Sequence, residues 1–322
     1  MKRLFGLIIV SVVLSIILSA CEKNTSTPVV EDDESVVTQL AQNDEEDYLL
    51  DEGIDDVSED NMFDGYHSFG KISSPIDTVF RFGRIVHQRP HRVVTDVRRI
   101  SPDSIVVFVA REFGGRFIVI EKADDSTFVR HRKPLRHVVR RRAIYVKRSP
   151  SDTGQRPWKL ASVSLGQGNS VPNATIQINE ISVSSSGGAS VVFTDPLQTL
   201  LEIPDDVLTF VPGEEVTVQV KLSNSTVNPV DPLGNGSTET VLLHYGVNRH
   251  HHARKRFEYA GSDPLTGDQV YQGTWTIGQE PFRVYHAVVD AIDNGTIYDD
   301  DGTTYPYNSV TWSAPYRVVE TD

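Results

Sequence analysis

The chain has 322 residues, of which 39% are hydrophobic and 23% are charged, and its formal net charge is -13. This length is enough for about two domains of ordinary size, and the composition excludes a wholly disordered protein. A single Cys cannot form an internal disulfide, and the lack of an internal apolar run near 20 residues excludes a polytopic membrane protein.

The net charge conceals three blocks of opposite sign. Residues 22–66 carry a net charge of -15, residues 67–160 carry +13, and residues 161–322 carry -13. An acidic segment, a basic domain and an acidic domain therefore follow one another, with boundaries expected near 66 and 165. Opposite charges on adjacent segments predict that the acidic segment docks on the basic domain, and the alternative is a free acidic spacer.

The N-terminus has the form of a secretory leader. A short basic start precedes the apolar stretch 4–18, and small residues follow it. The tetrad Leu18-Ser19-Ala20-Cys21 resembles the lipobox of bacterial lipoproteins. That resemblance implies a signal peptide over 1–20, cleavage between Ala20 and Cys21, and acylation of Cys21. An uncleaved signal anchor with a chance Cys is the alternative.

Several acyl chains on one residue hold a protein stably on a membrane, so the body is expected to be tethered there through Cys21. Residues 21–35 are polar and acidic and predict a flexible spacer. Glu22 rather than Asp follows the Cys, which by resemblance to the sorting rule of some Gram-negative envelopes favours the outer membrane.

Residues 36–165 predict a basic domain with a short helix and an antiparallel sheet. Apolar residues at 36–50 recur at helical spacing, and Asp32 to Ser35 can cap the start. From Pro75 the pattern changes to period two, and turn residues separate the runs. Among these turns, Gly114-Gly115 predicts a tight hairpin. The expected strands cover residues 79–87, 92–100, 104–113, 116–121, 135–148 and 158–165.

The segments 142–147 and 158–164, with a Trp158-Lys159-Leu160 start to the second, resemble the last two strands of NTF2-like or cystatin-like curved sheets. The resemblance covers about 110 residues and implies a helix wrapped by a curved sheet. Clear helices between the first strands are missing, so a simple sheet on one helix is an equal interpretation.

The basic strands carry many arginines, and Arg136, Arg140, Arg141 and Arg142 stand closest together. They are candidates for a surface that binds an anionic ligand or polysaccharide. The alternatives are a solvated sheet face and an internal docking site for the acidic segment. Nucleic acid is not expected as a partner of a secreted chain.

Residues 170–322 show short alternating runs with regular turn residues, which predict a β-sandwich that folds by itself. The segment Val211-Pro212-Gly213-Glu214, which leads into an alternating strand, resembles bacterial Ig-like and fibronectin-like modules. Trp275 and Trp312 are expected in its core. The fold class is therefore mainly β: a short N-terminal helix with a curved antiparallel sheet, then an Ig-like sandwich.

Two clusters in this region have metal-ligand chemistry. The run His250-His251-His252, with His244 and His286, could supply imidazoles, although arginines and a lysine surround the run. The second cluster could bind Ca²⁺ through oxygen ligands, but its spacing does not fit an EF-hand and ordinary turns are the favoured interpretation. Its candidate ligands are Asp290, Asp293, Asp299, Asp300 and Asp301.

Nucleophile, Walker and zinc-protease motifs are all missing from the sequence. We therefore expect a membrane-tethered, non-enzymatic envelope lipoprotein that acts as a binding, structural or adhesion module. An envelope glycan, an anionic polymer or a protein is its expected partner, and no resident cofactor is expected. The alternative is an NTF2-like enzyme or small-ligand binder, in which Asp96 would pair with His87, His91 or His137.

Overall fold

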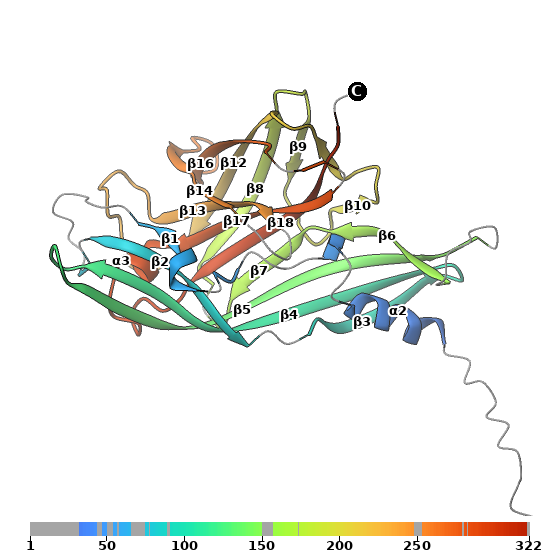
Figure 1. Cartoon of the computed structure of the whole chain (residues 1–322), viewed down its shortest axis with the longest axis horizontal. Coiled ribbons are helices and arrows are strands. Elements are labelled where there is room, and N and C mark those ends of the chain that lie inside the picture. The colour runs from blue at the N-terminus through green and yellow to red at the C-terminus, as the bar shows by residue number, and fades with distance from the viewer. Residues whose placement is uncertain are drawn as a thin grey trace, which may run out of the picture.

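The strands of the described chain form two sheets in this computed structural model (Figure 1). The larger sheet follows the order β1-β2-β4-β5-β7-β18-β17-β13-β14, with β3, β6, β10 and β11 attached to its sides, and the smaller follows β15-β16-β12-β8-β9. The structure describes residues 32–43, 47–49, 54–56, 58–65, 75–76, 78–88, 91–149, 157–172, 174–247, 253–278, 280–281 and 283–320.

The element bounds fall in chain order. The helical elements are α2 (Asp33–Gln42), η1 (Asp47–Leu49), η2 (Glu59–Asn61) and α3 (Asn294–Tyr298). The first strands are β1 (Phe63–Asp64), β2 (Val79–Gln88), β3 (Val93–Ser101), β4 (Ser104–Lys122), β5 (Phe128–Lys147), β6 (Trp158–Ser164), β7 (Gly166–Ser170), β8 (Ile176–Ser185) and β9 (Ser190–Phe193). The remaining strands are β10 (Leu200–Glu202), β11 (Leu208–Phe210), β12 (Glu215–Asn224), β13 (Glu239–Val247), β14 (Ala253–Arg256), β15 (Glu258–Ser262), β16 (Gln269–Thr276), β17 (Arg283–Asp293) and β18 (Ser309–Val318).

A long β4–β5 hairpin is the spine of the larger sheet. Its two strands pair over their whole length, from Ser104 opposite Val146 to Lys122 opposite Phe128. The tight turn predicted at Gly114-Gly115 is therefore wrong, because β4 runs straight through both glycines. A Cβ on Gly115 would lie 2.1 Å from the carbonyl oxygen of Ile85, so the glycine permits a close approach of β2 at a bulge.

Helix α2 lies against the β3–β4–β5–β6 end of this hairpin, which confirms that the acidic segment docks on the basic sheet. The Asp32 side chain caps the helix by accepting from the amide of Ser35 at 2.7 Å. Val37 and Ala41 are fully buried in a cluster with Tyr145 and other sheet residues, and Leu49 joins the same cluster. Leu50, expected to dock as well, lies outside the described residues.

Charge complements this apolar contact. Asp33 accepts from the indole of Trp158 at 3.1 Å and forms ion pairs with Arg99 and Lys147, which together hold the pKa of its carboxyl below the usual value. Farther along the segment, Glu59 pairs with Arg130 at 3.0 Å. Because exposed pairs contribute little, the buried apolar residues are the main source of this docking energy.

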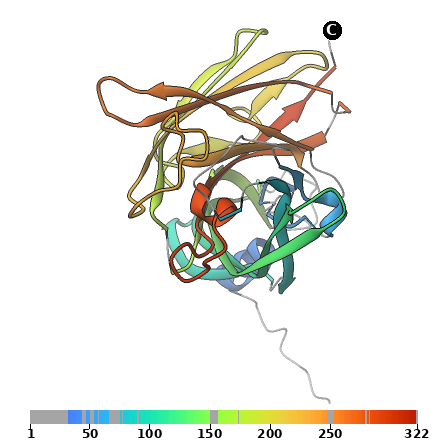
Figure 2. The same ribbon diagram turned by 90° about the vertical axis from the view of Figure 1, so that its left-hand side faces the viewer.

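The larger sheet continues across the boundary expected near 165–170. Strand β7 pairs with β5 on one side and with β18 on the other, so the two regions expected as separate domains share one sheet. The hairpin and β2 curve around one face of β13, β17 and β18, while the smaller sheet covers the other face (Figures 1 and 2). The mainly β fold with a short N-terminal helix and antiparallel sheets is thereby confirmed.

The smaller sheet and the outer face of β13, β17 and β18 enclose an apolar core. Trp275 and Trp312 are 5% and 3% exposed in it, as predicted. The run 254–259 is divided at the buried residue Phe257, where the chain passes from β14 in the larger sheet to β15 in the smaller. Helix α3 was not predicted, because the residues of this segment favour turns.

Candidate binding cleft

An open cleft of about 510 Å³ lies at one end of the sandwich. Three loops border it: the segment between β7 and β8, the loop that follows β12, and the loop between α3 and β18. Loop ends of sandwiches carry binding sites in many proteins, because loops vary freely while the sheets hold them in place. The lining is rich in hydroxyl and amide groups, and it includes Pro172, Thr175, Ser225, Thr226, Val227, Asn228, Asp293, Thr303, Thr304, Tyr305 and Asn308.

Asp293 forms the floor of this cleft. Its carboxylate caps α3 by accepting from the amide of Gly295 at 2.8 Å. It also accepts from the side-chain amide of Asn224 at 3.0 Å and from the hydroxyl of Thr226 at 2.8 Å. The same Asn224 amide donates to Glu239 at 2.6 Å, and burial raises the pKa of that carboxyl. The floor is thus a fixed array of hydrogen-bonded polar groups.

Hydroxyl and amide side chains connect the loops across the cleft. The Asn308 amide donates to the Thr175 hydroxyl, which lies 2.5 Å from the hydroxyl of Thr226. The Tyr305 hydroxyl donates to the carbonyl oxygen of Asn228 at 2.8 Å. Asn228 has a positive φ of 54°, a conformation that Asn tolerates better than most residues. These bonds keep the cleft walls preformed.

Lys133 of β5 anchors the α3–β18 loop from below. Its ammonium donates to the carbonyl oxygens of Gly295 at 2.8 Å and Tyr305 at 2.6 Å. Burial lowers its pKa to about 8, while Asp299 and Asp293 oppose that shift. A side chain from the basic region therefore positions one wall of the cleft.

The five aspartates that were candidate calcium ligands do not converge. Asp293 caps α3, and Asp290 lies in an ion pair with Arg84. Asp299 and Asp301 accept backbone hydrogen bonds within their own turn, from Asp301 and Thr303 respectively. Over the described ranges, no group of three or more His, Cys, Asp or Glu side chains is arranged to hold a metal ion.

The candidate imidazole set is also divided. His244 lies 3.2 Å from Asp290, and His286 lies 2.7 Å from the carbonyl oxygen of Asp47. The run 250–252 lies outside the described residues. The pairs suggested for an NTF2-like enzyme do not meet either: Asp96 forms an ion pair with Arg98, His87 and His91 are exposed, and His137 is fully buried.

The four candidate arginines lie on opposite faces of β5. Arg141 is 1% exposed and donates to the hydroxyl of Ser313 at 2.7 Å inside the molecule. Arg136 pairs with Glu112 on the outer face, and Arg140 donates to Asn169 at 2.8 Å. Arg142 donates to the carbonyl oxygen of Leu197 at 3.2 Å. The pleat explains the division, since neighbouring residues of a strand point to opposite sides.

A buried charge network fills the space between the hairpin and β17–β18. Arg84 donates through both terminal nitrogens to Asp290, at 2.5 and 2.8 Å, and through its Nε to the hydroxyl of Tyr307 at 2.8 Å. Burial opposes ionisation of Asp290, but Arg84 and His244 outweigh it and hold the pKa of this carboxyl well below its usual range.

His137 extends this network to β18. Its ring nitrogens lie 3.0 Å from the Tyr307 hydroxyl and 3.2 Å from the Thr311 hydroxyl. Burial, aided by the charge of Arg84, lowers the pKa of His137 to about 3. A neutral imidazole therefore bridges two hydroxyls at neutral pH. Local sequence patterns do not reveal this network, because its members come from strands far apart in the chain.

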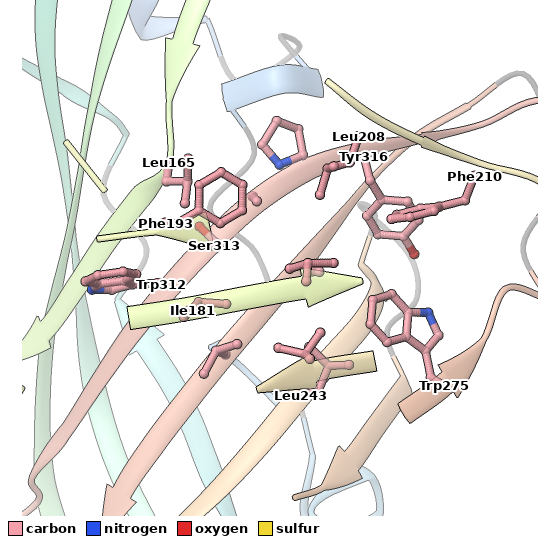
Figure 3. A pocket seen from close by; sticks show the side chains of 16 residues that line it. Leu165, Ile181, Phe193, Leu208, Phe210, Leu243, Trp275, Trp312, Ser313 and Tyr316 are labelled. Carbon is pink, nitrogen blue, oxygen red and sulfur yellow. The ribbon is translucent and has the colours of Figure 1, made fainter. Parts of the chain in front are cut away.

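The apolar core of the sandwich contains a cavity of about 40 Å³ (Figure 3). Leu243, Phe193, Trp312 and Trp275 are among the side chains around it. Pockets for organic ligands measure roughly 300 to 1,000 Å³, so this cavity is a packing void. The cleft above Asp293 is the better candidate for a binding site.

Comparisons with known proteins add no family. No protein-family model and no curated protein matches the sequence. A solved structure of Extended-Synaptotagmin 2, comprising its SMP domain and two C2 domains, aligns at 8% identity over 73% of this chain and 89% of that one, with a TM-score of 0.15. A TM-score of this size does not indicate a shared fold. Among the described residues, none of the helices is long and apolar enough to cross a membrane.

Proposed function

We propose that the chain is a lipid-anchored, non-enzymatic protein of the bacterial cell envelope that binds hydroxyl-rich ligands, namely envelope glycans, in the cleft above Asp293. The lipobox tetrad that ends at Cys21 supports the anchor, and Glu22 after it favours the outer membrane. The single observation that carries the binding function is the open, preformed cleft lined by hydroxyls and amides.

The chemistry of the lining fits a saccharide. Sugar hydroxyls both donate and accept, and amide, carboxylate and hydroxyl side chains offer both roles. Tyr305 adds a ring with an apolar face and a polar tip, which suits the mixed surface of a sugar. The alternative site inside the curved sheet has less support, because α2 and the charge network occupy that interior.

The binding test uses the mature chain with Cys21→Ser, titrated calorimetrically with a panel of peptidoglycan fragments and outer-membrane oligosaccharides. Val227 is 80% exposed at the cleft rim, so Val227→Arg should obstruct the cleft without disturbing the core. We expect affinity to fall at least about tenfold, roughly 1.4 kcal/mol. Val192→Arg is the matched control, since Val192 is 55% exposed on β9. Equal losses of affinity in the two variants, or no binding of any ligand in the panel, would contradict glycan binding in this cleft.

The anchor has a separate test. Cells that express the full chain should hold it in the membrane fraction, and Cys21→Ser should release it after a wash in high salt. Retention of Cys21→Ser after that wash would contradict lipidation of this residue.

A further inference from the structure

The outer face of the β3–β4–β5 region carries a row of arginines. On β5 the pleat directs Arg132, Arg136, Arg140 and Arg142 outward, because residues 133, 135, 137, 139 and 141 between them are buried. Arg116 on β4 and Arg98 on β3 extend the row to the neighbouring strands. We refer to these six residues as the arginine face.

The fold leaves much of this charge uncompensated. Only Arg136 and Arg98 form ion pairs with described residues, namely Glu112 and Asp96, and these two arginines remain 57% and 68% exposed. Arg116 and Arg132 are exposed and have no ion-pair partner among the described carboxylates. By contrast, the bases that point inward from β5, namely Lys133 and Arg141, are buried and hydrogen-bonded. The charges of Arg116, Arg132 and the exposed parts of Arg98 and Arg136 are therefore available to an external anion, whereas Arg140 and Arg142 donate to Asn169 and Leu197.

Phe108 adds an apolar element to this face. The guanidinium of Arg98 lies 5.1 Å from the centre of its ring, and that of Arg142 lies 5.2 Å from it. Stacking on an aromatic ring fixes a guanidinium in position. At the same end of the sheet, Ile100 is 60% exposed. Fixed guanidiniums beside exposed apolar side chains are suited to a surface of lipid headgroups.

The point where the acidic segment enters the fold identifies which surface is within reach. Asp33, the first residue of α2, pairs with Arg99 on the edge strand β3, on the face opposite to that of its neighbour Arg98. Ten residues, 22–31, separate Asp32 from Cys21. Even fully extended they span at most about 35 Å. The body of an anchored protein would thus stay close to the membrane, with the β3 edge of the sheet, where the arginine face begins at Arg98, nearest the tether.

We propose that the arginine face lies on the anionic headgroups of the membrane that holds Cys21. This inference rests on the proposed lipid anchor. Guanidiniums bind phosphate oxygens in pairs, and each base near an anionic leaflet adds to the attraction. The β4–β5 hairpin lies on the side of the molecule opposite the smaller sheet (Figures 1 and 2). Docking through this hairpin would therefore direct the sandwich away from the bilayer.

The test uses the full mature chain with Cys21→Ser, so that any binding reflects the protein surface alone. Co-sedimentation is measured with vesicles of phosphatidylcholine, with or without about 30% phosphatidylglycerol, at low and high salt. The variant Arg132→Glu with Arg140→Glu reverses two charges of the face. Lys255→Glu with Arg283→Glu, two exposed bases outside it, is the matched control of equal charge change.

We expect binding to the anionic vesicles alone, weakening with salt because exposed charges are screened beyond about 8 to 10 Å. The Arg132/Arg140 variant should bind the anionic vesicles at least about tenfold more weakly than the natural surface does. The control variant should lose less than about threefold. No binding, or equal losses in both variants, would overturn the proposal. So would retained vesicle binding in the Arg132/Arg140 variant alongside lost binding to a soluble polyanionic glycan, which would assign the face to that ligand. A failed anchor would show instead in the cell fractionation, where the natural chain would wash off like Cys21→Ser.

Discussion

Strands β13, β17 and β18 face two interiors that differ in chemistry. On one side they present His244, Asp290 and Thr311 to the hairpin, and these polar side chains are almost fully buried. On the other side they present Leu243, Val289 and Trp312 to the smaller sheet, where the core is apolar. The same backbone therefore supports a charge-paired interior and a hydrophobic one.

The two interiors depend on different conditions. An apolar core is stabilised in proportion to the area it removes from water. A buried ion pair such as Arg84 with Asp290 bears a desolvation cost that is offset only while both partners are present. The charged interior thus requires particular partners, whereas the apolar interior requires mainly that its side chains fill the available volume.

Residues 170–322 expressed alone give the largest expected effect. The polar faces of β17 and β18 need Arg84, His137 and Arg141, which all precede residue 170. Without them Asp290 would be left exposed or unpaired, and we expect no cooperative melting by circular dichroism. The sequence alone predicted the opposite. A sharp β-type transition in this fragment would show that the apolar interior suffices.

Asp290→Ala should destabilise the whole chain by about 3 to 5 kcal/mol, because it leaves Arg84 charged and buried without its partner. The double variant Arg84→Met with Asp290→Leu should lose less than the single one. The measurement is urea unfolding at neutral pH.

Leu243→Ala with Val289→Ala provides the comparison in the apolar interior. Leu243→Ala alone should cost about 2 to 5 kcal/mol, and the second substitution should add to it. The double variant Arg84→Met with Asp290→Leu could lose as much free energy of unfolding as Arg84→Met and Asp290→Leu lose separately, added together. In that case the two interiors do not differ in how far their members depend on one another.

The pH dependence of stability should also separate the two interiors. An unfolded His takes up a proton near pH 6.5, whereas His137 in the fold has a pKa of about 3. Between these values the unfolded state binds more protons, so stability falls as pH falls, by at most about 1.4 kcal/mol per pH unit. From about pH 6.5 to about pH 5 the loss should reach roughly 1.6 kcal/mol.

His137→Gln should flatten that part of the profile, while His87→Gln, at an exposed position, should leave it unchanged. Urea unfolding over this range is the measurement. Asp290 does not interfere, because its depressed pKa removes stability only at lower pH, below the ordinary range of an unfolded carboxyl. A slope unaffected by His137→Gln would contradict the buried neutral imidazole.

Sequence patterns predicted much of this fold because they report local geometry. Alternation along 176–183 and 216–222 corresponds to β8 and β12, and the acidic caps before Val36 correspond to α2. The docking of α2 also followed from opposite segment charges and an apolar stripe. The coarse fold class therefore needed only periodicity, turn residues and charge.

Alternation could not reveal that both faces of a strand are buried. In β18 the residues Ser309, Thr311 and Ser313 alternate with apolar ones, which in a sandwich normally indicates a solvated face. Here they meet Asp290, His137 and Arg141 instead. The contacts with His137 and Arg141 join strands more than 170 residues apart in the chain. The candidate cleft was only partly predicted for the same reason. Asp293 and its turn were singled out, but its partners Asn224 and Thr226 come from the end of β12 and the loop after it.

The smallest expected effect concerns the volume requirement of the apolar interior. Ala287 and Ala314 stand opposite each other on β17 and β18, and both line the cavity of about 40 Å³. Ala287→Val places two methyl groups where the cavity leaves room, and a β-branched residue suits a strand. Each buried CH₂ is worth about 0.8 kcal/mol, so a gain of about 1 kcal/mol in the free energy of unfolding is expected after some strain.

Ala291→Val on the same strand is the control. Ala291 is fully buried in the same core but does not line the cavity, so overpacking there should cost about 1 to 3 kcal/mol. The measurement is the thermal melting of both variants compared with that of the natural chain. If Ala287→Val destabilises as much as Ala291→Val, the core is already filled to the limit that its side chains tolerate, and the apolar interior demands shape as strictly as the charged interior demands its partners.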